Sequence, residues 1–362
     1  MHKNKNAVLT FIMKEWLLLI SLLALGGTSL WLWKVPHYSL EGVEPIFLFF
    51  ALFVAAKGIE KSFFFQCLAR HMEGGHFLAP KFVLLTFLIS LIVSIDVSLV
   101  VILPILFAMH IRNKINLAVV VALTAHVGAA LTPFGTPQNL FIFSFYHLNV
   151  VEFIRVIAPF SMGLLLLFLA ASFFIRVEYT APEACEAPKV NWLMTVAYLL
   201  LFGSVVLAVF RIIPIYIAVL PPLFALLFDR KSLRIDYLLL LTFLVFLGLA
   251  ENVRAIIDIW VTHPGHIFLL TAGLSQIISN VPATLLLEKF TQEWEALLWG
   301  SNVGSFGTPI AAMANLIAYR LFLSSGSGAQ SGRYLLRFTG FSLIALLAGG
   351  GLYVGYLEGW FW

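Results

Sequence analysis

Four short segments of this sequence combine residues that can bind a small ion with residues that interrupt a helix. Two of them, SIDVS (94–98) and SNVPA (279–283), place small polar residues at the centre of long apolar runs. The other two, TPFGTPQN (132–139) and NVGSFGTP (302–309), contain both Gly and Pro. Pro removes a backbone donor and Gly permits unusual dihedral angles, so these segments break a helix. The N–H end of a broken helix attracts an anion, and the C=O end attracts a cation.

The four segments form two matched pairs. Residues 84–98 align with 269–283 at an offset of 185, which superposes a Leu-Leu-Thr run and two serines. Residues 125–143 align with 301–319 at an offset of 176. Paired Gly/Pro-broken apolar segments in the two halves of a membrane protein point to the binding site of a carrier. The sequence therefore predicts one membrane module written twice.

The composition is that of a membrane protein. Of the 362 residues, 61% are hydrophobic and 11% are charged, and the mean hydropathy is +0.99. Soluble domains average about 25% charged residues. The two cysteines, Cys67 and Cys185, form neither a metal-binding spacing nor a disulfide framework. The net charge of +4 is explained by basic loops on one side of a membrane, not by nucleic-acid binding.

We predict an all-α polytopic membrane protein with about nine spans, because each crossing needs roughly 20 apolar residues. The spans are expected at 14–33, 45–60, 116–147, 154–176, 191–210, 213–228, 236–250, 295–322 and 338–360, with re-entrant hairpins at 82–109 and 266–288. The expected organisation is an N-terminal helix (1–43), a first inverted repeat (44–177), connecting helices (178–234) and a second inverted repeat (235–362).

Loop charges orient these spans. Placing the N-terminus in the cytoplasm puts the basic segments on that side, namely 57–81, 110–115, 229–234 and 329–337. One hairpin then enters from each side, so the repeats are inverted and the C-terminus lies outside. We expect the basic N-terminus to begin a retained helix and not a signal peptide. Two amphipathic stretches, 61–76 and 251–263, are expected either along the membrane surface or as ordinary loop helices.

Small hydroxyl, amide, glycine and proline residues at the four segments are the candidate site for substrate and ion. In the first half they are Ser94, Asp96, Ser98, His126, Thr132, Pro133, Gly135, Thr136 and Asn139. In the second half they are Ser279, Asn280, Ser301, Asn302, Gly304, Ser305, Gly307 and Thr308. Three neighbours, Gln138, Thr284 and Asn315, are explained equally well by hydrogen bonding between helices.

Asp96 is the most informative of these residues. An ionisable group inside a membrane segment is costly and by default indicates function. Asp96 could bind Na⁺, carry a proton or oppose a substrate; the alternative is that it caps the broken helix. His126 suits proton coupling because histidine exchanges protons near neutral pH, although a neutral core histidine is the equal alternative. Lys57 and Glu60 lie near a membrane edge, where extension of the side chain toward water explains them.

The four motifs resemble those of the citrate-transporter-like permeases of the ion transporter superfamily. That group includes divalent anion–sodium symporters, arsenite efflux permeases and one family of sodium/proton antiporters. The likeness rests on SIDVSLV, HVGAALTPFGTPQNLFIFSFY, SQIISNVPATLLL and GSNVGSFGTPIAAMANLIAYR, which occur in this order. It implies a homodimer in which a mobile bundle carries both hairpins and both broken helices by elevator-type alternating access. It also implies Na⁺ and carboxylate binding at Ser-Asn motifs, with Na⁺ at Ser279, Asn280 and Asn302.

The first half departs from that family pattern at two positions. Ile95 stands where the pattern has Asn between Ser94 and Asp96, and His126 stands where Asn would precede Val-Gly. Both missing amides are candidate cation ligands. Their loss weakens a first-half Na⁺ site and favours proton coupling through Asp96 and His126.

Together these features predict a secondary active transporter of a small anion, either a di- or tricarboxylate or an oxyanion, coupled to Na⁺ or H⁺. Cation/proton antiport centred on Asp96, arsenite-type efflux and, more distantly, an ion channel are the alternatives. The sequence has no H-E-x-x-H, G-x-S-x-G or Walker motif, so we expect neither an enzyme nor an ATP-driven pump. The expected location is a bacterial inner membrane. The expected partners are the anion, the lipid bilayer and a second copy of the chain, without a cofactor or nucleic acid.

Overall fold

The computed structural model describes residues 15–71, 77–111, 114–175, 179–180, 189–257, 259–326 and 328–361. The first half contains helices α2 (Trp16–Leu32), α3 (Leu40–Lys61), α4 (Phe64–His71), α5 (Leu78–Ile92), α6 (Ile95–Ala108), α7 (Lys114–Ala130), α8 (Pro137–Phe145) and α9 (Val150–Phe173). Among the described residues, one antiparallel pair joins β1 (His110–Ile111) to β2 (Tyr179–Thr180). The predicted all-α fold is confirmed.

The second half follows the same order. Its helices are α10 (Trp192–Val209), α11 (Leu220–Phe228), α12 (Tyr237–Ile256), α13 (Pro264–Ile278), α14 (Asn280–Leu287), α15 (Trp294–Val303), α16 (Met313–Ser324) and α17 (Ser331–Leu357). Short 3₁₀ turns are η1 (Ile215–Val219), η2 (Arg230–Leu233), η3 (Glu288–Phe290) and η4 (Gly328–Gln330). Helices α5–α6 and α13–α14 form the two predicted hairpins, and α7–α8 and α15–α16 are the two predicted broken helices.

Five helical segments in the described part of the chain are by themselves long and apolar enough to cross a membrane. They are Gly42–Lys61, Val150–Phe173, Trp192–Val209, Arg230–Ile256 and Gly328–Leu357. The remaining predicted spans and hairpins coincide with shorter apolar helices or with helices interrupted at their centre. These interruptions are expected, because irregular backbone at membrane depth is tolerated where protein surrounds it.

The two predicted amphipathic stretches, 61–76 and 251–263, differ from each other in the structure. Stretch 61–76 contains the short helix α4, and its last residues, 72–76, lie outside the described residues. In the second, α12 continues to Ile256, and the described residues after it form no separate helix before α13. The predicted start of the first span at residue 14 also lies outside the described residues.

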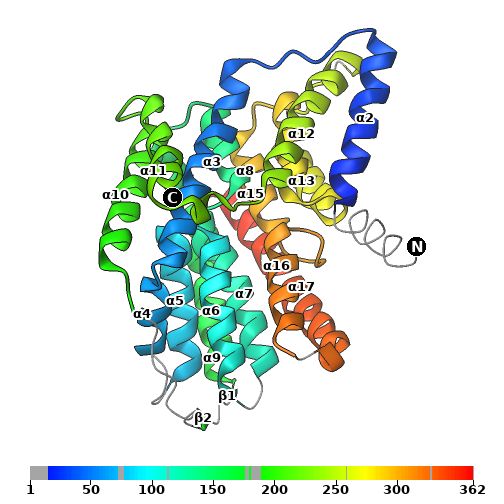
Figure 1. Ribbon diagram of the computed structural model, residues 1–362. Coiled ribbons are helices and arrows are strands. Elements are labelled where there is room, and N and C mark those ends of the chain that lie inside the picture. Colours follow the sequence, from blue (N-terminus) through cyan, green and yellow to red (C-terminus); the bar gives the residue numbers. More distant parts are fainter. Residues whose placement is uncertain are drawn as a thin grey trace, which may run out of the picture.

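The first helix of each half packs against the other half. Helix α2 lies along α12, and α10 lies along α3, on opposite sides of the molecule (Figure 1). The amide of Asn252 in α12 donates hydrogen bonds to Thr28 Oγ1 at 3.0 Å and Ser29 Oγ at 2.9 Å in α2. At Gly58 in α3, an added Cβ would lie 2.4 Å from the Tyr198 ring of α10, so only glycine permits this approach. The two halves are therefore interlocked.

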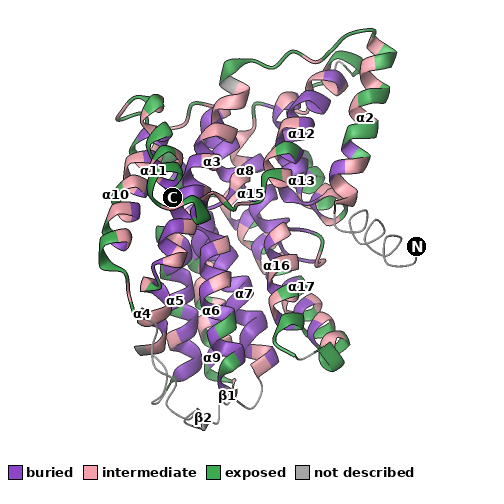
Figure 2. Cartoon of the chain, in the orientation of Figure 1, coloured by how far each residue is buried: buried purple, intermediate pink, exposed green. Residues whose placement is uncertain are grey.

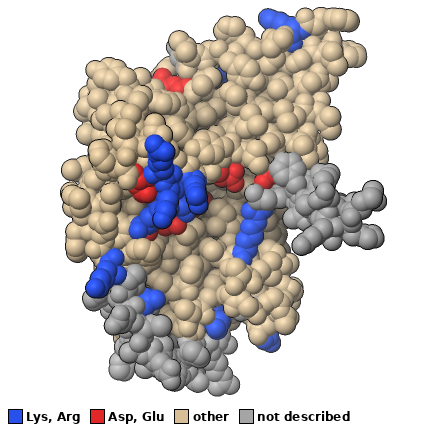
Figure 3. Space-filling view, viewed as in Figure 1, with Lys and Arg blue, Asp and Glu red and all other residues tan. Residues whose placement is uncertain are grey.

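The centre of the molecule is formed by the hairpins and broken helices. Every residue of α7 from Leu117 to Ala130 is buried, whereas Leu18 and Ser21 alone are buried in α2 (Figure 2). The outer helices expose large apolar side chains, such as Trp31 and Leu200, as a protein surrounded by lipid would. Charged side chains are sparse on the face drawn in Figure 3, and most of them gather near its middle.

Candidate functional site

Each hairpin tip meets a helix break through the same backbone contact. In the first half, the Ile95 N–H donates to the Gly135 carbonyl at 3.3 Å. In the second half, the Asn280 N–H donates to the Ala311 carbonyl at 2.9 Å. Ile95 and Asn280 are separated by the sequence offset of 185, and Gly135 and Ala311 by the offset of 176. The sequence alignment of the repeats thus corresponds to matched hydrogen bonds.

The glycine of each Val-Gly pair lets the broken helix lie against its hairpin. A Cβ added at Gly128 would lie 2.2 Å from Ser90 Oγ and 2.4 Å from the Phe87 carbonyl oxygen. A Cβ added at Gly304 would lie 2.8 Å from Ser275 Oγ, at the equivalent place in the second half. Gly304, predicted as a site residue, is therefore explained by close helix packing.

Two side-chain pairs cross between the halves. His126 Nε2 lies 2.7 Å from Asn315 Oδ1, and the Asn302 amide donates to Asn139 Oδ1 at 2.9 Å. His126 aligns with Asn302 and Asn139 aligns with Asn315, so these are one contact made twice. The imidazole of His126 takes the place of an amide in this contact.

The surrounding hydrogen bonds fix the tautomer of neutral His126. The Asn315 amide donates to the Ser305 carbonyl at 3.0 Å, which turns Asn315 Oδ1 toward the histidine ring. Because an amide oxygen only accepts, His126 Nε2 carries the hydrogen and Nδ1 keeps its lone pair. Nδ1 has no hydrogen-bond partner among the described residues. His126 is buried, with 4% of its surface exposed, and it borders a cavity.

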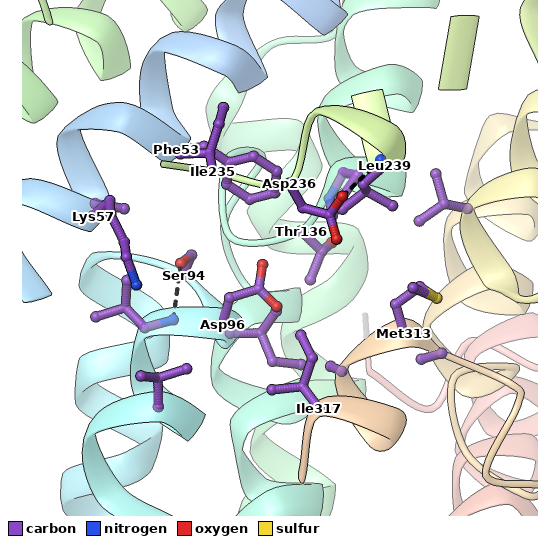
Figure 4. Close-up of a pocket in the computed structure, with 18 of the residues that line it drawn as sticks. Phe53, Lys57, Ser94, Asp96, Thr136, Ile235, Asp236, Leu239, Met313 and Ile317 are labelled. Carbon is purple, nitrogen blue, oxygen red and sulfur yellow. Dashed lines mark hydrogen bonds between the residues drawn. The ribbon is translucent and has the colours of Figure 1, made fainter. Parts of the chain in front are cut away.

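That cavity has a volume of about 240 Å³ and lies where the hairpin tips and helix breaks meet α3 and α12. Its polar floor consists of Ser94, Asp96, His126, Thr136 and Asn280. Apolar side chains, including Phe53, Phe243, Met313 and Ile317, form much of the wall. In Figure 4 the Asp96 carboxylate points into the same space as Thr136 and Asp236. A small polar ligand fits this arrangement of a few polar groups among apolar ones.

Ser94 and not Asp96 caps the broken helix. Ser94 is the N-cap residue of α6, and its hydroxyl accepts from the Val97 N–H at 3.5 Å. Asp96 lies in the first turn of α6, half-buried, and its carboxylate makes no hydrogen bond to a described residue. The helix N-terminus stabilises the ionised carboxylate. Ser94 thus performs the capping role that was the alternative for Asp96. The Asp96 carboxylate is directed into the cavity.

Five of the predicted site residues border the cavity, namely Ser94, Asp96, His126, Thr136 and Asn280. The other twelve do not border it: Ser98, Thr132, Pro133, Gly135, Asn139, Ser279, Ser301, Asn302, Gly304, Ser305, Gly307 and Thr308. Several of these hold the tips and breaks together. Ser98, for example, donates to the Thr86 carbonyl at 3.2 Å and joins the two arms of the first hairpin. Their role as ligands stays a prediction.

The predicted sodium ligands of the second half are engaged in local hydrogen bonds. Asn280 Oδ1 accepts from the Val281 N–H at 3.0 Å, and Ser279 Oγ lies 3.5 Å from the same oxygen. The Asn302 amide donates to the Leu298 carbonyl at 2.9 Å as well as to Asn139. Sodium binding at Ser279, Asn280 and Asn302 stays a prediction.

The second helix break is closed by a residue that the repeat alignment does not match. The Gln276 amide donates to the carbonyls of Gly304 at 3.0 Å and Phe306 at 2.9 Å. Its oxygen accepts from the Thr308 N–H at 2.9 Å. The residue at the equivalent place in the first half is Leu91. The Gln276 side chain therefore satisfies three backbone groups of the second helix break, whereas the Leu91 side chain cannot hydrogen-bond to the first.

The first helix break retains unpaired polar groups. The hydroxyl oxygens of Thr132 and Thr136 are buried and have no hydrogen-bond partner among the described residues. Buried polar groups are normally paired, so such exceptions suggest a site for a water, an ion or a ligand. The first helix break thus has unpaired hydroxyl groups available to a ligand, whereas three polar backbone groups of the second break are bonded to Gln276.

We expect Gln276→Leu to lower stability by about 2–4 kcal/mol. It would leave buried backbone groups unpaired, at about 1–3 kcal/mol each. Thermal unfolding of the purified protein in detergent measures this loss. Gln292→Leu is the matched control, because Gln292 is exposed. Equal unfolding temperatures for the two variants would contradict the bracing role of Gln276.

Sequence reasoning missed the charged residues of the cavity. Arg234, Asp236 and Arg320 border it but were not predicted, and Lys57 and Glu60 were attributed to contact with water. Lys57 Nζ lies 2.7 Å from both carboxylate oxygens of Glu60. A usable signal was helical spacing, since residues 53, 57 and 60 share one face of α3 and residues 313, 317 and 320 share one face of α16. Knowing which face is inward required the fold.

A membrane fold with two interrupted, inverted repeats around a polar cavity defines a membrane transporter. The chain belongs to the citrate transporter family, whose model matches residues 8–304. It is similar to the uncharacterized transporter MJ0456 of Methanocaldococcus jannaschii, with 36% identity over 264 residues that cover 70% of this chain and 72% of the relative. It is also similar to the inner membrane protein YbiR of Escherichia coli, with 31% identity over 306 residues that cover 75% and 77%.

Proposed function

We propose that this protein is a secondary active transporter that moves a small anion, a carboxylate or an oxyanion, together with protons. The observation that carries the proposal is the presence of Asp96 and His126 on the floor of one cavity, beside the N-termini of two helices. Asp96 and His126 can carry protons, and the helix N-termini can hold an anion. Because both lie at the same cavity, proton binding and anion binding can influence each other.

The proposed anion site is formed by the N-termini of α8 and α16. Neither Thr136 nor Ala312, the N-cap residues, caps its helix through a side chain. Thr136 and Gln138 from one helix and Met313 and Ala314 from the other border the cavity. Free N–H groups and the positive ends of two helix dipoles favour an anion there.

Proton coupling follows from charge. An ionised Asp96 repels an anion on the cavity floor, and a proton on Asp96 removes that repulsion. His126 Nδ1 can accept a proton from the cavity while Nε2 keeps its bond to Asn315, and the resulting imidazolium attracts the anion. Because linkage is reciprocal, anion binding strengthens proton binding by the same factor.

Sodium is the second candidate for the coupling ion. The unpaired hydroxyl oxygens of Thr132 and Thr136 favour it, because hydroxyl and carbonyl oxygens are ligands for a hard cation. In that case Asp96 would neutralise the cation. If no anion is transported, Asp96 could bind Na⁺ and H⁺ alternately, and the protein would be a cation/proton antiporter.

We further propose elevator-type alternating access by a homodimer in the bacterial inner membrane. The cavity lies between α3 and α12 on one side and the hairpins and breaks on the other, which is where one bundle would slide past another. Lys57 and Arg234 border it from segments predicted to face the cytoplasm, and Arg320 lies near the predicted cytoplasmic end of the span 295–322. This conformation would then be open to the cytoplasm, with the N-terminus on the same side.

Uptake of radiolabelled succinate, citrate and phosphate into proteoliposomes tests the proposal. Inward H⁺ and Na⁺ gradients are imposed separately, with protein-free vesicles as the control. Uptake driven by the H⁺ gradient is expected. Uptake driven by Na⁺ alone would transfer the coupling to the Thr132–Thr136 site. Anion-independent proton flux driven by a cation gradient would replace symport with antiport.

We expect His126→Asn to fold normally but to weaken proton coupling. Asn is the residue found at the aligned position 302, and its amide can keep the contact with Asn315. It cannot accept a proton. The steepness of anion uptake with pH measures the effect: fewer protons should be coupled to each anion, with the unfolding temperature unchanged. A pH profile identical to that of the wild-type protein would remove His126 from the mechanism.

A further inference from the structure

Two arginines that border the cavity have no ion-pair partner among the described residues. Arg234, between η2 and α12, and Arg320, near the end of α16, both border the cavity and are exposed. Neither makes an ion pair or hydrogen bond with another residue that the structure describes. Figure 3 shows Lys and Arg side chains gathered near the middle of this face, with carboxylates beside them.

The other charges around the cavity have partners or fixed roles. Lys57 is paired with Glu60 at 2.7 Å. The Asp236 carboxylate accepts from the Leu239 N–H at 3.2 Å and caps α12. Asp96 remains on the floor. The cavity lining therefore holds the two guanidinium groups of Arg234 and Arg320 without ion-pair partners among the described residues, whereas its acids are the exposed Asp236, which caps α12, and Asp96 on the floor.

Arg320 lies at a different level from the helix break that begins α16. Met313, Ile317 and Arg320 border the cavity at spacings of four and three residues, so they form one stripe along α16. Seven residues separate the break at Met313 from Arg320, which is about 10 Å along the helix axis. An anion held at the break thus has a second cationic region within about 10 Å, and closer when the Arg320 side chain folds back.

We propose that Arg234 and Arg320 determine specificity by binding a second anionic group of the transported molecule. This rests on the proposed function, in which the first anionic group lies at the N-termini of α8 and α16. A planar guanidinium binds a carboxylate or phosphate group through two parallel hydrogen bonds. The selected substrate is then an elongated anion with at least two anionic groups, and not a compact oxyanion.

The competing explanation is that both arginines are ordinary basic residues at the cytoplasmic edge. Lys231 separates the two accounts, because it lies in the same turn as Arg234, is exposed and does not border the cavity. If all three are ordinary edge residues, replacing Arg234, Arg320 or Lys231 should affect transport to the same extent. Residues that contact the substrate should act on affinity, and only for substrates with a second anionic group.

The test compares Arg320→Gln, Arg234→Gln and Lys231→Gln with the wild-type protein in proteoliposomes under an H⁺ gradient. Transport is measured for acetate, succinate, citrate and inorganic phosphate. We expect each arginine variant to raise KM for the multiply charged carboxylates about tenfold, equivalent to about 1.4 kcal/mol, with little change in maximal rate. Values for acetate and the Lys231→Gln variant should match the wild type.

Arg320→Lys keeps the charge but loses the bidentate geometry, and it should give an intermediate KM. Unfolding temperatures in detergent show whether each variant is folded. If the wild-type protein transports an anion but the arginine variants behave like Lys231→Gln, the specificity site is wrong and the proposed function stands. Preferred transport of phosphate unaffected by either arginine overturns it in the same way. Absence of wild-type transport of all four anions, under the H⁺ gradient and under a separately imposed Na⁺ gradient, overturns the proposed function itself.

Discussion

We expect Asp96→Asn to reduce proton-driven accumulation of anion severalfold while leaving anion exchange intact. Asn resembles the protonated carboxyl in shape and charge, so the cavity floor would no longer repel the anion. Because Asn neither gains nor loses a proton, the pH gradient would act only through His126, and accumulation should fall well below that of the wild-type protein. Exchange of internal for external labelled anion needs no net proton movement and should continue.

Both rates can be measured on one preparation of proteoliposomes. Glu152→Gln is the matched control, because Glu152 is exposed in the first turn of α9 and lies outside the cavity. The control should retain both accumulation and exchange. Uphill accumulation in Asp96→Asn equal to that of the wild-type protein would rule out this carboxylate as a proton carrier. Loss of exchange together with accumulation would instead assign Asp96 to ligand binding or to the stability of the tip.

The second large effect is expected at Gly128. Gly128→Ala places a methyl group 2.2 Å from Ser90 Oγ and 2.4 Å from the Phe87 carbonyl oxygen. The serine hydroxyl can rotate away, but the carbonyl belongs to the backbone of α5, so α7 must move away from the hairpin. Overpacking of this kind costs about 1–3 kcal/mol or more. The unfolding temperature should fall, and the cavity between the tips and breaks should be distorted.

Gly203→Ala provides the control for this substitution. Gly203 also lies within an apolar helix, α10, but an added Cβ there meets nothing within 4 Å. Because alanine favours helices over glycine by about 1 kcal/mol, Gly203→Ala should be neutral or stabilising. Equal unfolding temperatures for the two variants would mean that α7 does not lie closely against the Phe87 carbonyl of α5.

The repeat pattern in the sequence predicted the site's framework because symmetry relates backbone positions. The offsets of 185 and 176 map Ile95 onto Asn280 and Gly135 onto Ala311, and the structure shows the same backbone hydrogen bond in each pair. Asp96 and His126 were identifiable because a membrane segment has few reasons to contain an ionisable residue. These inferences depend on the order of residues along the chain and not on helix rotation.

What the sequence did not predict depends on rotation and on distant segments. Thr308 and Thr136 occupy similar motifs, but Thr136 borders the cavity, whereas Thr308 is bonded to Gln276. Gln276 was missed because its aligned residue is Leu91, so the repeat comparison discards it. Arg320 was missed because it lies seven residues beyond the break, where the fold alone decides whether a side chain faces the cavity or the membrane edge.

The exchange of first helices between the halves has a consequence for how the protein is made. About 130 residues separate the end of α3 from the start of α10, which packs against it. At 5–20 residues per second, α3 would wait roughly 7–26 s for its neighbour during synthesis. Helix α2 waits longer still for α12. Folding into the bilayer is therefore completed only late in translation, and a nascent chain halted after the first half would expose surfaces for which membrane chaperones and quality-control proteases compete.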